Sequence, residues 1–350
     1  MKGPVVLLTL VLLSTVVIYP AMVRIEATGV LGPNSQLEEA SEGSYFIPED
    51  MTIKDDGFHG EQRVHAETWY YEALFNGQSS MVFIVSVLSL PDGRTGLAMA
   101  GLYLYRQGQL IAMERHTTTV FTAALDQPRI TLDGIPVIEG DLNLNGDLVY
   151  DVSFIQNGIG IELTFVNQSK GWMGDMGRGW WLAVPELQVM GTMTIDGQSH
   201  AVTGTGYHDH NIFSLLNPLL EHGYLDGKMT SKQFSLVWGY ILESRLKTHS
   251  FAIVSEDGGY LGLGPDAVDI SFSSYTLDNR TCIPTKCTIH IDDPAHDISA
   301  TIWMNATAMH HIQLPLLNYW RYHVEVTGWL RSPSHHEVLD GQGMMEYMLY

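Results

Sequence analysis

Basic residues and cysteines are scarce in this chain, and both shortages exclude classes of protein. The 350 residues include 18 Lys and Arg against 39 Asp and Glu, which gives a formal net charge of −21. Since no basic run offsets phosphate repulsion, we expect no nucleic-acid partner. Two cysteines without further spaced ligands make no zinc signature, and no Gly-x-Ser-x-Gly elbow or phosphate-binding loop occurs. We therefore expect no metal and no cofactor.

Helical periodicity is also scarce, whereas signals for strands and tight turns are frequent. The chain is 45% hydrophobic and 16% charged, as in globular proteins, and is long enough for two domains. Short alternating runs are separated by ten Asn-Gly or Asp-Gly dipeptides, which suit the positive φ angles of hairpin turns. These patterns predict an all-β protein of two consecutive antiparallel barrels or sandwiches, residues 46–214 and 215–350. The dipeptides begin at positions 56, 76, 92, 133, 145, 157, 196, 226, 257 and 340.

The N-terminus has the pattern expected of an export signal. Lys2 precedes an uncharged run over 5–19 that extends to Arg24, about 19 apolar residues and close to the minimum for one membrane span. Residues 1–27 are interpreted as a cleaved signal peptide or a retained anchor, and 28–45 as a linker. Both alternatives place the protein outside the cytoplasm, secreted or anchored to the membrane.

In that oxidising compartment Cys282 and Cys287 can form a disulfide, the alternative being two separate thiols.

The densest chemistry lies at Tyr207-His208-Asp209-His210, inside an apolar β-type stretch. On a strand, Tyr207 and Asp209 share one face, and His208 and His210 share the other. A buried carboxyl or imidazole is costly unless it is paired or acts on a ligand. This segment is therefore the first candidate for a site.

The order of several motifs resembles the carotenoid 1,2-hydratase and AttH-like family, which is itself similar to tocopherol cyclases and fungal Diels–Alderases. The resemblance covers nearly everything after residue 60 and implies two lipocalin-like domains with a ligand pocket in or between them. It implies acid-promoted addition or cyclisation on polyene and isoprenoid substrates. The chain departs from the family at Thr68, Ile212, Phe213 and Tyr240. The matching stretches run over residues 65–71, 181–185, 204–211, 234–240 and 339–347.

Adding water to an alkene, or cyclising it, needs a proton donor in a dry pocket, and a carboxyl kept neutral by burial can serve. We assign that role to Asp209 with Tyr207, while His208 or His210 orients Asp209 or acts as base. Glu67 is a second candidate acid. Aromatic faces stabilise a cationic intermediate, and the candidates for this role are Trp69, Tyr70, Phe213 and Trp238.

Two alternatives compete with this catalytic interpretation. The His-Asp-His segment can simply tie strands together, and Trp69 and Trp238 can be core residues. A metal is the other alternative, because His208 and His210 lie two residues apart on one strand face. The remaining ligands would then come from His222, His249 or the pairs at 310–311 and 335–336.

The sequence therefore predicts an exported protein that binds an apolar isoprenoid or polyene, with the membrane surface as a further contact. It leaves open whether the protein hydrates or cyclises the ligand, or carries it without catalysis. A third interpretation is a structural envelope protein without an apolar ligand.

Overall fold

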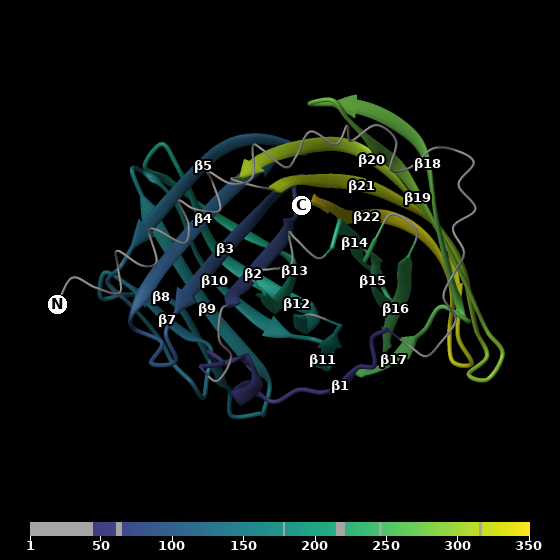
Figure 1. Cartoon of the computed structure of the whole chain (residues 1–350), viewed down its shortest axis with the longest axis horizontal. Helices are drawn as coiled ribbons and strands as arrows, with labels where there is room; N and C mark the ends of the chain where they lie inside the picture. Colours follow the sequence, from purple (N-terminus) through teal and green to yellow (C-terminus); the bar gives the residue numbers. More distant parts are fainter. Residues whose placement is uncertain (1–44, 61–64, 178, 215–220, 245–246, 315–316) are drawn as a thin grey trace.

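The computed structural model describes residues 45–60, 65–177, 179–214, 221–244, 247–314 and 317–350. The predicted signal or anchor, and all but the last residue of the predicted linker, lie outside these residues. Within them the chain is almost entirely β-strand, in two antiparallel sheets that lie side by side (Figure 1). This confirms the predicted all-β class. No helix in the described part of the chain has the length and apolar character of a membrane span.

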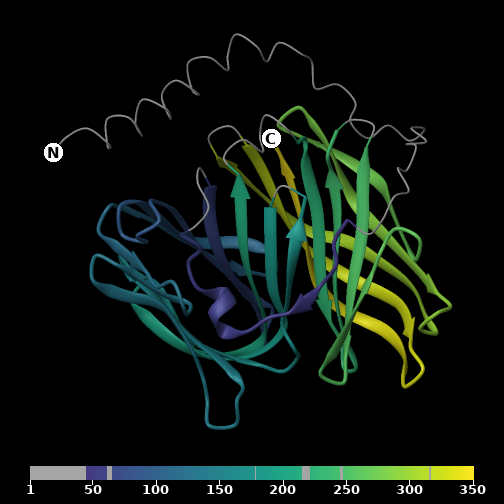
Figure 2. The same ribbon diagram turned by 60° about the horizontal axis from the view of Figure 1, so that its bottom comes forward.

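The first sheet curls into a barrel whose central strands carry the candidate motif. Its order is β5-β4-β3-β2-β13-β12-β10-β9-β8-β7-β6, while β1 (Glu49–Asp50) and β11 (Trp172–Met176) attach beside β12. The 3-10 helix η1 (Ile53–Asp56) lies between β1 and β2 in the chain and packs against the sheet (Figure 2). The strands are β2 (His65–Phe75), β3 (Ser79–Ser89), β4 (Gly96–Arg106), β5 (Gln109–Thr118), β6 (Phe121–Ala123), β7 (Arg129–Leu132), β8 (Ile135–Leu142), β9 (Leu148–Gln156), β10 (Ile159–Asn167), β12 (Gly179–Ile195) and β13 (Gln198–Ser214).

The second sheet is curved, and the C-terminal strand lies in the middle of it. Its order is β17-β16-β15-β14-β22-β21-β20-β19-β18, so β22 inserts between β14 and β21. The strands are β14 (Gly223–Thr230), β15 (Phe234–Leu242), β16 (Thr248–Glu256), β17 (Gly259–Leu263), β18 (Val268–Asp278), β19 (Thr281–Asp293), β20 (Ile298–Leu314), β21 (Leu317–Arg331) and β22 (His336–Leu349).

Three apolar cores hold the two sheets. One fills the first barrel, one fills the concave side of the second sheet, and the third lies between the sheets. Trp69 belongs to the first core and Trp238 to the second, while Tyr70 and Tyr207 belong to the third. The strand pair β2–β13 therefore separates the barrel interior from the surface that faces the second sheet.

Four of the predicted turn dipeptides form two-residue hairpin loops in which both residues have positive φ, as a type I′ turn requires. These loops join β7 to β8, β9 to β10, β12 to β13 and β16 to β17, at 133–134, 157–158, 196–197 and 257–258.

The turn interpretation is wrong at two other dipeptides. Asp226-Gly227 lies inside β14, and Asp340-Gly341 lies inside β22. At Gly227 a β-carbon would come within 2.6 Å of the Trp238 indole, so glycine is needed there for close packing and not for a turn.

The predicted disulfide is not formed. Cys282 and Cys287 are both free, and both lie on β19. Since they are five residues apart on one strand, their side chains point to opposite faces. Cys282 is exposed and Cys287 is buried in the second core. The structure therefore contains the alternative of two separate thiols.

Candidate functional site

Strand β13 divides the candidate motif between two places. His208 and His210 point into the first barrel, where their ring nitrogens contact Asp56 and Glu67. Tyr207 and Asp209 point the other way, toward the second sheet, and Tyr207 belongs to the core between the sheets. All four side chains are buried. The predicted partnership of either histidine with Asp209 is therefore not a direct contact.

The polar residues between the sheets form a group that we call the intersheet cluster. Charged side chains from the first sheet face charged side chains from the second across it, and tyrosines surround them. Its members are Tyr70, Glu72, Tyr207, Asp209, Asp226, Lys228, Tyr319, Arg321 and Glu346.

Two carboxylates and two cations connect the sheets. The Tyr70 hydroxyl lies 2.6 Å from a carboxylate oxygen of Glu72 and 2.6 Å from one of Glu346. Arg321 Nη2 lies 3.0 Å from Glu72 Oε2. Lys228 Nζ lies 3.6 Å from Glu72 and 3.8 Å from Glu346. Buried charges are tolerated only when they are paired, and here the opposite charges of the two sheets neutralise one another across the interface.

Lys228 is also held by aromatic faces. Its ammonium group lies 4.3 Å from the ring centroid of Tyr70 and 4.1 Å from that of Tyr207. Burial works against the charge, but the Glu346 and Glu72 carboxylates outweigh it and raise the Lys228 pKa. The lysine is therefore a fixed cation beside Tyr207.

Burial shifts two acids of the cluster, Asp209 and Asp226, toward their neutral forms. It raises the pKa of Asp209 to about 6, with the Lys228 charge opposing and Glu346 adding to the shift. It raises the pKa of Asp226 as well, and Glu346 adds to that shift. The Tyr207 hydroxyl and Asp226 Oδ1 are buried and have no hydrogen-bond partner among the described residues. Proton donors and acceptors are thus concentrated around Tyr207.

A cavity of about 220 Å³ opens beside this group. Glu72, Tyr207 and Lys228 contribute its charged and phenolic lining, while Phe75, Pro185, Met229 and Met344 are among its apolar lining residues. Asn76, Thr205, Thr230 and Gln342 also line it, so apolar and polar groups share the pocket, as they do in small-molecule sites. The pocket lies between the two sheets, which is one of the two locations that the resemblance implies.

A break in the β12–β13 ladder opens the sheet at this point. The register shifts between Val184 and Leu187. Two residues of β12, Pro185 and Glu186, therefore lie opposite the single residue Tyr207 of β13. Proline has no N–H to donate, and bulges of this kind are common beside active sites. Gly204 meanwhile lets β13 approach β2 closely, since a β-carbon there would come within 2.0 Å of the Leu74 carbonyl oxygen.

The residues inside the barrel form a second polar group, which we call the inner cluster. It consists of Asp56, His59, Glu67, His208 and His210. Asp56 contacts both histidines of β13, at 3.0 Å from His208 Nε2 and 3.3 Å from His210 Nδ1. His208 Nδ1 also lies 3.0 Å from the Tyr70 carbonyl oxygen.

Mutual pairing sets the protonation states of the inner cluster. Burial opposes the charge of Asp56, but His208 and His210 lower its pKa to about 2. Burial likewise opposes the charge of His210, but Asp56 and Glu67 raise its pKa to about 9. Trp69 stacks on the His210 ring at 4.2 Å and donates its indole N–H to the Asp56 carbonyl oxygen at 3.0 Å.

The other predicted residues are divided between the two faces and the cores. Trp238 is buried in the second core, where its indole N–H donates to Met304. Phe213 stacks on Tyr224 with 6.4 Å between ring centroids. Tyr70 joins the intersheet cluster and Glu67 the inner cluster. Of the predicted residues, Tyr207 lines the cavity, and Tyr70 and Asp209 belong to the same intersheet cluster.

Sequence reasoning missed most of the charged residues in both clusters. Asp226 was missed because its Asp-Gly dipeptide was interpreted as a turn. The other missed residues lie on strands that carry further charges, or in the segment just before β2. A charge between apolar or aromatic neighbours was the available signal, and it applies to Glu72, Arg321 and Glu346.

The histidines of the metal alternative do not assemble around His208. His249 contacts Glu243, His310 contacts Tyr105, and His335 contacts Glu256. Two groups of three ligand types nevertheless have ligand atoms within 4.8 Å of one another, namely His59, Glu67 and His210, and Glu256, Asp257 and His335. His210 thus converges with residues other than those that the sequence indicated.

No protein-family model and no curated protein sequence matches this chain. Solved structures do. A proposed AttH protein from Nitrosomonas europaea aligns with a TM-score of 0.63 and 14% identity, over 85% of this chain and 97% of that one. The fold is AttH-like. CghA with Sch210972 gives 0.59 and 13%, over 82% and 88% of the two chains. Kievitone hydratase from Nectria haematococca gives 0.53 and 10%, over 81% and 88%.

Proposed function

We propose that this protein binds a polyene or isoprenoid with an oxygen-bearing end in the intersheet cavity, and promotes its hydration or cyclisation. The observation that carries the proposal is the placement of Tyr207, Lys228 and Glu72 in the lining of a cavity that also has apolar lining residues. Names of proteins with similar folds support it, since one is a hydratase and another was crystallised with Sch210972.

The cavity favours a ligand with one polar end. Phe75, Met229 and Met344 offer apolar surface for hydrocarbon, while the Tyr207 hydroxyl and the Lys228 ammonium offer donors to an oxygen atom. Pockets for drug-sized ligands commonly have volumes of about 300–1,000 Å³. A cavity of about 220 Å³ therefore holds a small ligand or the reacting end of a longer one.

The same donors can catalyse the reaction. A carbonyl oxygen placed between Tyr207 and Lys228 draws electron density from its conjugated alkenes, and fixed donors stabilise the negative charge that develops on it. Asp209 lies on the same strand face as Tyr207 and is the acid that supplies a proton. In hydration, the water oxygen bonds to one alkene carbon, a proton bonds to the other, and the second water proton restores the acid. In cyclisation the proton is returned and the mass does not change.

The alternative is a carrier that uses the same cavity without chemistry. Its specific support is the departure of Ile212 and Phe213 from the family pattern beside the motif. Export to the outside of the membrane, as predicted from residues 1–27, would bring either an enzyme or a carrier to a membrane-soluble ligand.

The first experiment identifies the ligand and then measures turnover. Protein purified from its own membrane is extracted with organic solvent, and the extract is analysed by mass spectrometry. The recovered compound is then incubated with the protein in water labelled with oxygen-18. An enzyme gives a labelled hydrate or an isomer of unchanged mass, and Asp209→Asn abolishes either product while binding remains.

A carrier gives no product from the wild type and binds the compound normally in both forms. The matched control is Asp151→Asn on an exposed position of β9, which should behave like the wild type. Recovery of no apolar compound, together with no binding of added polyenes, would overturn both interpretations in favour of a structural protein.

A further inference from the structure

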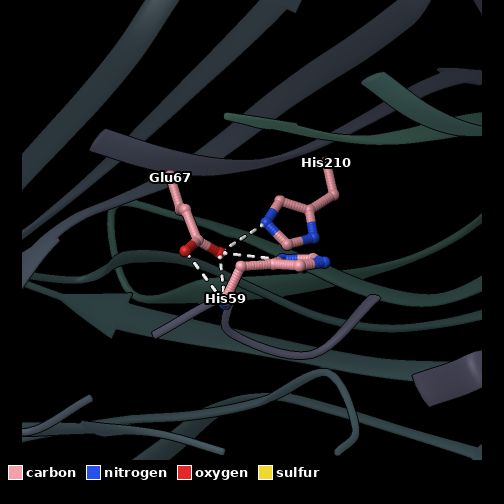
Figure 3. A group of neighbouring side chains, drawn as sticks. All are labelled: His59, Glu67 and His210. Carbon is pink, nitrogen blue, oxygen red and sulfur yellow. Dashed lines mark hydrogen bonds and ion pairs between the residues drawn. The ribbon is translucent and has the colours of Figure 1, made fainter. Parts of the chain in front are cut away.

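The inner cluster contains three metal-ligand side chains that lie outside the proposed reaction. His59, Glu67 and His210 come from the segment after η1, from β2 and from β13, and their ligand atoms lie within 4.8 Å of one another. Figure 3 shows the carboxylate and both imidazoles turned toward one another. We propose that these residues bind one divalent transition-metal ion, with zinc as the expected metal.

The distances suit such an ion. His210 Nε2 lies 3.0 Å and His59 Nδ1 lies 3.4 Å from the same oxygen, Glu67 Oε2. Zinc bonds to nitrogen and oxygen ligands are about 2.0–2.2 Å long, so neighbouring ligand atoms of a tetrahedral zinc lie roughly 3.3–3.5 Å apart. Small side-chain shifts would bring all three ligand atoms to bonding distance. Two imidazoles and one carboxylate are a common zinc donor set, with a fourth position for water.

The surrounding contacts orient the ligands as metal sites require. The other ring nitrogen of His210, Nδ1, lies 3.3 Å from Asp56 Oδ1. A carboxylate in that position fixes the imidazole and leaves Nε2 as the ligand atom, as outer-shell partners do in zinc sites. The His59 backbone N–H lies 2.9 Å from Glu67 Oε1 and 3.0 Å from Glu67 Oε2, which holds the carboxylate beside both imidazoles. Asp56 is held in turn by His208.

The site also has a route for entry and a dry wall. The His59 side chain is 30% exposed, whereas Glu67 and His210 are fully buried. An ion can therefore reach the buried ligands past His59. Trp180 packs against both imidazoles, with ring centroids 4.7 Å from His59 and 5.5 Å from His210. An apolar wall of this kind limits water around the ion and strengthens its bonds.

The second converging group provides an internal comparison. Glu256, Asp257 and His335 are half-buried or exposed, and their contacts with Ser332 and with one another lie at a strand end. In contrast to the first group, they have no buried outer-shell carboxylate among the described residues. We therefore assign the ion to His59, Glu67 and His210.

Zinc binding by the full chain tests this proposal. Calorimetry and thermal unfolding measure the binding. Chelator-treated protein is titrated with zinc chloride. We expect one equivalent to bind and the melting temperature to rise by about 5 °C when zinc is in large excess over its Kd. His59→Ala removes a partly exposed ligand without opening the core. It should weaken binding by more than the roughly 10- to 100-fold that losing an outer-shell partner costs.

His335→Ala is the matched control and should leave zinc affinity and stoichiometry unchanged. Cobalt gives a second readout, because a tetrahedral site with nitrogen and oxygen ligands produces visible absorption bands that His59→Ala should abolish. Equal zinc affinity in the wild type and in His59→Ala would overturn the assignment. So would the absence of zinc binding, which would make the cluster a hydrogen-bonded network alone. Neither result bears on the cavity on the other side of the sheet.

Discussion

The two faces of the β2–β13 strand pair carry similar residues in contrasting settings. On the inner face, Asp56 contacts both His208 and His210 inside the barrel core. On the outer face, Tyr207 and Lys228 border a cavity between the sheets. The four consecutive proton-active residues 207–210 therefore do not form one site. Period-two alternation points one pair into the barrel interior and the other toward the second sheet.

The largest expected effect comes from breaking the outer face. Arg321→Met leaves the buried Glu72 carboxylate without its closest cation, and loss of one partner of a buried ion pair costs about 3–5 kcal/mol. Unfolding in denaturant, followed by tryptophan fluorescence, measures this loss. Arg331→Met is the control, because the exposed pair of Arg331 with Asp297 is worth about 0–1 kcal/mol. Equal stability of the two variants would show that the intersheet charges do not hold the sheets together.

The next prediction separates function from stability on that face. Tyr207→Phe removes a hydroxyl that has no hydrogen-bond partner among the described residues, so the free energy of unfolding should change by less than about 1 kcal/mol. Turnover of the extracted ligand should fall by about 10²–10³-fold, since this is the cost of removing one donor to an oxygen on which negative charge develops. Product formation by mass spectrometry checks this. Undiminished turnover would remove Tyr207 from the reaction.

The inner face should respond in the opposite way. His208→Phe deprives Asp56 Oδ2 of its partner, and a buried acceptor left without one costs about 1–3 kcal/mol. Ligand binding in the intersheet cavity should persist, because the His208 ring lies on the other side of the strand. Chemical unfolding and ligand titration of the same preparation measure both quantities. Loss of binding without loss of stability would contradict the division between the faces.

The smallest effect on the free energy of unfolding is expected for the exposed cysteine of β19, Cys282. Cys282→Ser replaces an exposed thiol and should change the free energy of unfolding by no more than about 0.5 kcal/mol. Alkylation under denaturing conditions without reductant should label both cysteines. A single unlabelled pair, or a loss of about 2–4 kcal/mol, would instead indicate a disulfide.

Much of the fold could be predicted, because alternation and turn chemistry are local properties of the chain. The Asp-Gly and Asn-Gly turns at 133–134, 157–158, 196–197 and 257–258 are read from adjacent residues. The opposite orientations of Tyr207 and His208 follow from the same local rule. The same rule, applied to the cysteines five residues apart, argues against their pairing.

The sites were harder to predict because their members are distant in sequence. Glu72 and Glu346 meet through Tyr70 across 274 positions, and no local pattern joins them. Asp56 and His59 lie in a short segment before β2 whose approach to β13 depends on tertiary packing. Local motifs therefore identified the strand that carries both sites, but not the partners that distinguish one site from the other.

The proposed ligand lies in the cavity between the sheets and contacts the outer face of β13. Photolabelling tests this placement most directly, with a short polyprenyl ketone that carries a diazirine on its hydrocarbon end. Peptide mass spectrometry should locate the label on cavity residues such as Phe75, Met229 and Met344, and excess unlabelled ketone should prevent it. Labelling of residues inside the first barrel, or labelling that competition does not reduce, would contradict this placement.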